Sequence, residues 1–262
     1  MLLGYHEFAL TPSADIYCVT PEIFFGHLQV AKAAQACLPA SLHGCGDPSA
    51  EVIVTFDDAH ISQLRHALPL LERTGTVGHF FVPTGWVGHS THTATWNDLR
   101  ALVRLGHCVG SHSHRHALLT QCSTPVLRDE LITSKMLLED RLGEPIDSIS
   151  MPGGRYNRRV LAECEDAGYR RIFSSRPQPD MPRAHGDYGS TTVTGRLIVR
   201  RTLPLQTIAG YVRGERSTVY RLQLGYSCRR AVKAAAGDVL YQAMWRALLR
   251  RMRDTQLAEQ GT

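Results

Sequence analysis

The sequence predicts an α/β fold, a distorted (β/α) barrel with a helical extension at the C-terminus. Short apolar, β-branched segments alternate at least five times with helical patterns, which is typical of a mainly parallel sheet. Polar residues follow several of these segments, as expected where parallel strands end. A chain of 262 residues suits one large domain with an appendage. We expect the barrel over residues 1–210 and a basic helical extension, packed on it, over 211–262.

The first third of the chain supplies three predicted strands and two predicted helices. The run of β-branched residues that enters Asp57-Asp58 is the strongest strand signal among them. The expected elements are a strand ending at Tyr5-His6, a helix after Pro21, a strand over 51–56, a helix over 60–73 and a strand over 77–82 that Pro83 ends.

The helices of the middle of the chain carry recognisable end signals. Thr95 and Asp98 form a capping box for a helix that Gly106 ends. A second helix is expected with Thr124 as N-cap, Pro125 at its first position and Gly143 as its stop. The other expected elements are a strand around Cys108-Val109, strands over 146–151 and 171–175, a helix over 158–167, a loop over 177–192 and a last strand over 196–203.

Composition excludes several classes of protein. With 43% apolar and 20% charged residues, the chain is typical of an ordered globular protein. The net charge of +5 comes without a basic face interleaved with aromatics, so nucleic acid is not an expected partner. The seven cysteines are scattered and form no CxxC pair, which favours reduced thiols over a disulfide framework. With no signal-peptide pattern and no stretch able to span a bilayer, the predicted location is cytoplasmic.

From about residue 211 the pattern is helical, with apolar residues against arginines. An amphipathic helix packed on the barrel is the favoured interpretation, because such a helix exposes a solvated arginine face. Weak contact with an anionic membrane is the alternative.

Two clusters of polar residues could hold a metal ion. Asp57 and Asp58 follow a buried strand, where adjacent acids need a cation or hydrogen bonds, although turns and helix caps also use such pairs. His112, His114 and His116 form the second cluster. In a helical turn His112 and His116 would share a face and suit a tetrahedral ion, whereas an extended segment would align all three. The residues alone leave both arrangements open.

A third segment, Pro152-Gly153-Gly154-Arg155-Tyr156-Asn157, reads as a turn that enters a helix. It is either a simple tight turn with Asn157 near the N-cap or a groove wall whose amides meet a substrate oxygen.

The order and spacing of these motifs resemble the polysaccharide deacetylase family (NodB homology, carbohydrate esterase family 4). Residues 55–59 resemble the TFDDG motif of that family, 78–82 its TFFV strand, 110–116 its H-S/T-x-x-H motif and 152–157 its PYGxYN-like third motif. The resemblance covers roughly residues 50–175.

This resemblance implies a metal-dependent hydrolase that removes an N-acetyl group from an amino sugar. It makes Asp58, His112 and His116 the metal ligands and Asp57 the general base for a metal-activated water. Zinc is the expected ion, and cobalt, nickel or iron would suit the same ligands. The expected substrate is an N-acetylated saccharide or sugar conjugate, and the resemblance places the substrate against Pro152, Gly153, Gly154, Arg155 and Tyr156.

The chain departs from the family at three positions. Ser150 stands where the family often has an arginine that orients the base, and Ala59 stands where it has glycine. The late catalytic histidine has no match, because Arg200 and Arg201 occupy that region and could border the site.

Residues 2–6 resemble the N-terminal YH segment of a subgroup that includes biofilm poly-N-acetylglucosamine deacetylases. This resemblance makes His6 the acid that protonates the leaving amine. Two alternatives stay open: another amide or deformylase-type hydrolase on the same scaffold, and a catalytically silent carbohydrate-binding protein.

Overall fold

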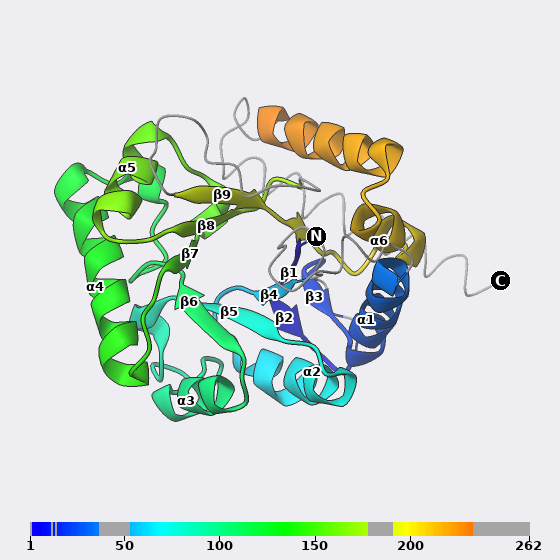
Figure 1. The fold of residues 1–262 in the computed structure, drawn as a ribbon, viewed down its shortest axis with the longest axis horizontal. Coiled ribbons are helices and arrows are strands. Elements are labelled where there is room, and N and C mark those ends of the chain that lie inside the picture. The colour runs from blue at the N-terminus through cyan, green and yellow to red at the C-terminus, as the bar shows by residue number, and fades with distance from the viewer. Residues whose placement is uncertain (1, 12, 14, 37–52, 178–190, 233–262) are drawn as a thin grey trace. The chain divides into compact units, whose positions relative to one another are not determined.

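Eight parallel strands form a nearly closed barrel with helices on its outside, which confirms the predicted fold class (Figure 1). The computed structural model describes residues 2–11, 13, 15–36, 53–177 and 191–232. The strands are β1 Leu2–Tyr5, β4 Ile53–Phe56, β5 Gly78–Val82, β6 Cys108–Ser111, β7 Ser148–Ser150, β8 Arg171–Ser174, β9 Thr192–Gly195 and β10 Leu197–Ile198. They pair in the order β10-β1-β4-β5-β6-β7-β8-β9. A separate parallel pair joins β2 Glu7–Phe8 to β3 Cys18–Val19.

A single extended segment links the two edges of the barrel sheet. Its first half, β9, pairs with β8, and its second half, β10, pairs with β1. Only Arg196 separates the two halves. The predicted continuous strand over 196–203 is therefore wrong: within that range only β10 is a strand, and β9 lies just before it, because the two strands find their hydrogen-bond partners on different edges.

The first five helices around the barrel follow the predicted order, whereas α6 was not predicted. They are α1 Pro21–Ala36, α2 Leu68–Thr74, α3 Trp96–Arg104, α4 Thr124–Leu142, α5 Arg158–Asp166 and α6 Leu205–Val212. The capping box of Thr95 and Asp98 is present, and Gly143 ends α4 with a φ of 73°. The N-cap of α4 is Ser123, one residue before the predicted Thr124, and its side chain makes no capping hydrogen bond.

The predicted helix over 60–73 has two parts. A π-helical stretch, η2, covers Gln63–Ala67 and continues into α2. Pro69 lies in the first turn of α2. Proline has no N–H for the i−4 carbonyl and its ring crowds that carbonyl, so a single α-helical register cannot run through the segment.

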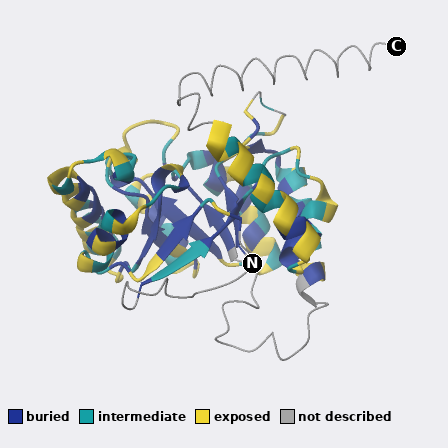
Figure 2. Ribbon diagram, turned by 90° about the horizontal axis from the view of Figure 1, so that it is seen from above, coloured by how far each residue is buried: buried dark blue, intermediate teal, exposed yellow. Residues whose placement is uncertain are grey.

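The two faces of the barrel strands bury different kinds of side chain. Between the sheet and the outer helices lies an aromatic layer in which the ring centroids of Tyr5 and Phe24 are 4.9 Å apart and those of Phe56 and Phe80 are 4.6 Å apart. Such rings supply much of the apolar area of a core. Figure 2 shows that the strands are buried almost throughout. The alternate residues, such as Thr55, point into the barrel, where the site is built.

The chain divides into two compact units, residues 1–219 and residues 220–262. A helix runs over residues 216–232, and the expected amphipathic residues 239–253 lie outside the described part of the chain. No helix in the described ranges is both long and apolar enough to cross a membrane.

Two buried histidines make the stability of the fold depend on pH. His27 bonds the Tyr5 hydroxyl at 3.1 Å, and His79 bonds Ser148 Oγ at 3.0 Å. Burial lowers the pKa of His27 from 6.5 to about 4; burial, followed by the charge of Arg171, lowers the pKa of His79 from 6.5 to about 3. Between pH 6.5 and these lowered pKa values, both histidines are protonated in the unfolded chain but neutral in the folded chain. The folded state therefore loses stability as the pH falls below 6.5.

We expect the free energy of unfolding to fall by about 1.4 kcal/mol per pH unit for each of these histidines between pH 6.5 and their folded pKa values. Urea titrations at pH 7 and pH 5 measure this fall. His79→Gln should reduce the difference, whereas the exposed His89→Gln should not. An equal difference in wild type and His79→Gln would contradict the assignment.

Candidate metal and catalytic site

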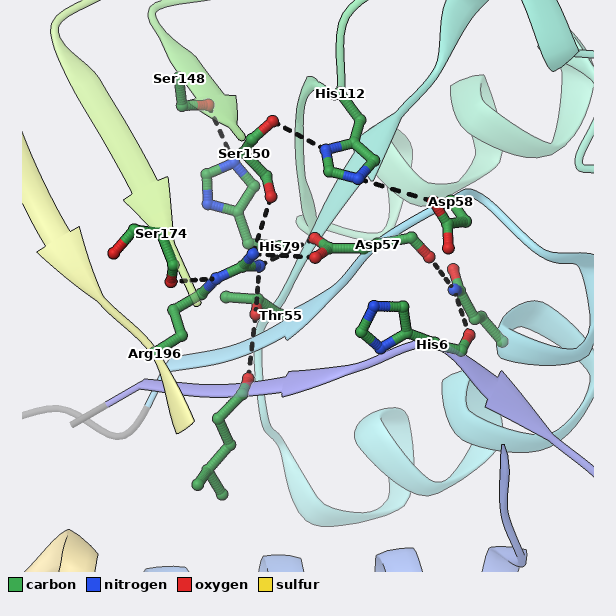
Figure 3. A network of polar contacts seen from close by, with 12 residues as sticks. His6, Thr55, Asp57, Asp58, His79, His112, Ser148, Ser150, Ser174 and Arg196 are labelled. Atoms are coloured by element: carbon green, nitrogen blue, oxygen red, sulfur yellow. Dashed lines mark hydrogen bonds and ion pairs between the residues drawn. The ribbon is translucent and has the colours of Figure 1, made fainter. Parts of the chain in front are cut away.

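Three side chains from two loops converge at the ends of β4 and β6. One ligand atom each of Asp58, His112 and His116 lies within 4.8 Å of the others, and this is the one such cluster found among the described residues. Nε2 of His112 and Nε2 of His116 lie 3.5 and 3.3 Å from Oδ1 of Asp58 (Figure 3 shows the first pair). That oxygen is buried and accepts no hydrogen bond. Two imidazoles and one carboxylate aimed at a common point fit a divalent cation.

The backbone is left-handed at four positions of these loops. The φ angles are 73° at Asp58, 49° at Ala59, 64° at Ser113 and 60° at His116. Such angles cost non-glycine residues roughly 1–3 kcal/mol each and tend to cluster at functional sites. The angle at Ala59 gives a reason for the glycine usual in the resembling family, because glycine adopts positive φ without a Cβ penalty.

Buried polar groups support the histidine loop. The carboxylate of Glu130 accepts the N–H groups of His114 at 2.9 Å and Arg115 at 2.7 Å. Nδ1 of His112 donates to the Ser150 carbonyl at 2.7 Å. Because a carbonyl only accepts, this bond leaves Nε2 of His112 unprotonated and free to bind a cation.

The third histidine of the loop turns away from the cluster. Nδ1 of His114 bonds Thr84 Oγ1 at 2.9 Å, and its carbonyl accepts the N–H of Gly85 at 2.7 Å. A Cβ at Gly85 would lie 2.8 Å from that carbonyl oxygen, so the approach needs glycine. The loop is neither of the two arrangements left open by the sequence, and two of its histidines converge on Asp58.

A buried ion pair fixes Asp57 beside this cluster. The guanidinium of Arg196 donates from Nη1 to Oδ1 and from Nη2 to Oδ2 of Asp57, both at 2.8 Å. It also donates to Thr55 Oγ1 at 3.0 Å and to Ser150 Oγ at 2.7 Å. Arg196 is 0% exposed. A bidentate pair of this kind fixes both the position and the orientation of the carboxylate.

Opposing effects act on the pKa of Asp57. Burial is the largest single effect and raises that pKa, but the charge of Arg196, the charge of His112, the Arg196 hydrogen bonds and the charge of His6 together outweigh it. The net effect holds the pKa of Asp57 well below its usual value of 3.8. The carboxylate is therefore ionised at neutral pH.

The sequence model of the polysaccharide deacetylase family matches residues 46–172, a range that contains the predicted base and all three predicted metal ligands. This segment of the chain is therefore similar to polysaccharide deacetylases. A putative polysaccharide deacetylase of Bacillus subtilis, YxkH, is 28% identical over 126 residues, which are 48% of this chain and 45% of the relative. An uncharacterized 30.6 kDa protein of Geobacillus stearothermophilus is 32% identical over 133 residues, 50% of this chain and 48% of the relative. The matches thus span about half the length of these curated relatives.

Solved structures of similar fold include several deacetylases. Streptococcus pyogenes deacetylase PplD, solved with acetate, has a TM-score of 0.65 at 22% identity, covering 78% of this chain and 94% of PplD. IcaB of Ammonifex degensii has a TM-score of 0.64 at 22% identity, covering 81% of this chain and 96% of IcaB. A polysaccharide deacetylase of Bacillus cereus has a TM-score of 0.66 at 19% identity, covering 80% and 68%. These likenesses establish the barrel fold.

Arg196 accounts for one departure of this chain from the motifs of the polysaccharide deacetylase family. Ser150 stands where the third motif often has an arginine. Here Arg196, which lies between β9 and β10, bonds both Ser150 and Asp57. Inside the barrel the Arg196 guanidinium lies over the Phe81 ring, with Cζ 5.4 Å from the ring centroid. Sequence reasoning missed Arg196, although the missing arginine was a signal that another cation had to neutralise Asp57.

His6 lies directly after β1 and beside Asp57 (Figure 3). Its Nδ1 is buried without a hydrogen-bond partner, and its ring centroid is 5.5 Å from that of Tyr17. An unpaired buried imidazole nitrogen costs stability unless a ligand or water meets it. The placement next to the site is compatible with the predicted role in proton transfer.

The third motif starts at Pro152, two residues after Ser150, which contacts both His112 and Arg196. Residues 152–154 form a turn, and Asn157 caps α5 by accepting the N–H of Val160 at 3.0 Å. The substrate contacts expected for this turn and for Arg155 and Tyr156 stay predictions.

Arg201 is one of the two arginines that could border the site according to the sequence. Its guanidinium donates to the carbonyl of Ser13.

Proposed function

We propose that this protein is a metal-dependent hydrolase that removes an N-acetyl group from an amino sugar, an N-acetylglucosamine-type saccharide or conjugate. The observation that carries the proposal is the cluster of Asp58, His112 and His116 beside an ionised Asp57. The match to the family model supports this proposal, because the model describes polysaccharide deacetylases. The structure of the deacetylase PplD, which has the same fold, was solved in complex with acetate, and this also supports the proposal.

The three side chains would hold a divalent cation, most simply zinc. When bound, such an ion supplies Lewis acidity that polarises the acetamide carbonyl and lowers the pKa of water. The orphaned Oδ1 of Asp58 and the Nε2 atom of His112 are the donor types that zinc, cobalt, nickel or iron accept.

Asp57 would accept the proton of the attacking water. Its ionisation at neutral pH leaves it ready for this step, and the Arg196 fork keeps the carboxylate from rotating. A carboxylate has more lone pairs than these bonds use, so it can still accept a proton.

His6 would donate a proton to the leaving amine. We expect His6→Ala to bind zinc as tightly as the wild type and to lower kcat by about a hundredfold, the scale of losing a general acid. Kinetics on an N-acetylated oligosaccharide, with zinc titration in parallel, measure both quantities. An unchanged kcat would make His6 a structural residue.

The location and the form of the substrate belong to the same proposal. The cytoplasmic location predicted from the sequence favours a nucleotide-linked, lipid-linked or small soluble N-acetyl sugar over an extracellular polymer. Hydrolysis of a formyl or other amide, and carbohydrate binding without catalysis, are the competing functions, and a substrate panel separates them.

The metal assignment has a test with an internal control. Asp58→Ala and His116→Ala should each weaken zinc binding by about a hundredfold or more, since three protein ligands become two. His114→Ala should leave it unchanged, because His114 belongs to the same loop but bonds Thr84. Competition with a chromogenic chelator measures the three affinities. Equal zinc affinity in His116→Ala and His114→Ala would overturn the ligand set.

A further inference from the structure

The buried side-chain amide of Gln63 joins the two segments that carry Asp57 and His6. Gln63 is 0% exposed. Its Nε2 donates to the carbonyl of His6 at 2.6 Å and to the carbonyl of Asp57 at 2.5 Å. Both partners only accept hydrogen bonds, so the amino group of the amide must face them.

This bridge lies where two barrel strands separate. The ladder between β1 and β4 ends with the N–H of Asp57 donating to the Tyr5 carbonyl at 2.9 Å. Beyond that point one segment continues through His6 into β2, and the other enters the left-handed turn at Asp58. Gln63 therefore bonds the first carbonyl after the end of the ladder on each side.

The local structure around Gln63 is unfavourable in two respects. Its Oε1 is buried without a hydrogen-bond partner, which costs roughly 1–3 kcal/mol. Gln63 is also the first residue of the π-helical stretch η2, and short π-helical segments occur frequently at functional sites. An apolar residue at this position would leave no buried polar atom unpaired. A residue that is kept in spite of such a local cost points to a functional role.

We propose, on the basis of the function proposed above, that Gln63 is a positioning residue that sets the imidazole of His6 against the reacting centre. Asp57 has other restraints, namely the two bonds from Arg196 and its own N–H bond to Tyr5. By contrast, no hydrogen bond restrains the His6 ring at Nδ1. Loss of the amide should therefore displace His6 more than Asp57.

A double-mutant cycle tests this role. Gln63→Leu, of similar size, should lower kcat on an acetamido sugar about tenfold or more, with KM and zinc affinity unchanged, since small misplacements of a catalytic group have effects of this size. In the His6→Ala background the same substitution should have no further effect, because two residues that act as one unit are not additive.

Thr74→Val is the matched control, because it removes a side-chain bond to the Leu70 carbonyl at the far end of α2. It should leave kcat unchanged in both backgrounds. An equal loss of kcat from Gln63→Leu in the wild-type and His6→Ala backgrounds would overturn the proposal, because a purely structural role acts in both.

A second readout does not need activity. The His6 Cε1–H resonance, assigned by its disappearance in His6→Ala, should shift in Gln63→Leu and stay in place in Thr74→Val. If the wild type releases no acetate, the proposed function fails. The position of this resonance then tests by itself whether Gln63 positions the His6 ring. An unshifted resonance in Gln63→Leu would overturn the positioning role.

Discussion

Asp57→Asn should lower acetate release by about two orders of magnitude or more while zinc stays bound, the scale of removing a general base. Asparagine keeps the shape of the side chain but cannot accept the proton of the attacking water. Zinc binding should persist, because the cluster of Asp58, His112 and His116 does not use the Asp57 carboxylate. Single-turnover kinetics with zinc titration measure both quantities.

This substitution also affects stability, and the kinetics must allow for that. Asp57→Asn leaves the buried guanidinium of Arg196 without a counter-charge, which is strongly destabilising. Rates are therefore compared at a temperature where circular dichroism shows both proteins folded. Loss of zinc from folded Asp57→Asn would mean that the two aspartates exchange roles.

Arg196→Met should reduce the free energy of unfolding by about 3–5 kcal/mol, the usual effect of breaking a buried ion pair on one side. Burial would then raise the pKa of Asp57 without the compensating charge of Arg196, so acetate release should also fall at neutral pH. Urea unfolding at pH 7 measures the stability change.

Arg171→Met is the matched control for this change. Arg171 pairs with Asp147 at 2.7 Å, but both side chains are about half exposed, so its loss should cost at most about 1 kcal/mol. The double variant Asp57→Asn/Arg196→Met should be less destabilised than the sum of its two single changes, since it leaves no unpaired charge. Additive losses would show that the pair is not coupled.

Local patterns were enough to predict most helices and the three residues, Asp58, His112 and His116, whose side chains converge in the structure. The capping box at Thr95 and the stop at Gly143 depend on residues next to them in sequence, and both are present. The ends of parallel strands lie at one edge of a barrel, so Asp58 and the pair His112 and His116 could be expected to meet.

Long-range features were beyond the reach of such patterns. Arg196 lies 139 positions from Asp57, between two strands too short to recognise singly, and its partner depends on how the barrel closes. The direction of His114 depends on Thr84 in another loop. The register change at Gln63 likewise reflects contacts with His6 and Asp57 as well as local helix propensity.

Acetate release by the zinc-loaded wild type, before and after chelation, tests the central claim most directly. The panel is N-acetylglucosamine oligomers, UDP-N-acetylglucosamine and simple acetamido sugars. We expect release from at least one compound, loss of release on chelation and its return with zinc. No release from any compound by the zinc-bound protein, or release that chelation does not change, would contradict metal-dependent N-deacetylation at Asp58, His112 and His116.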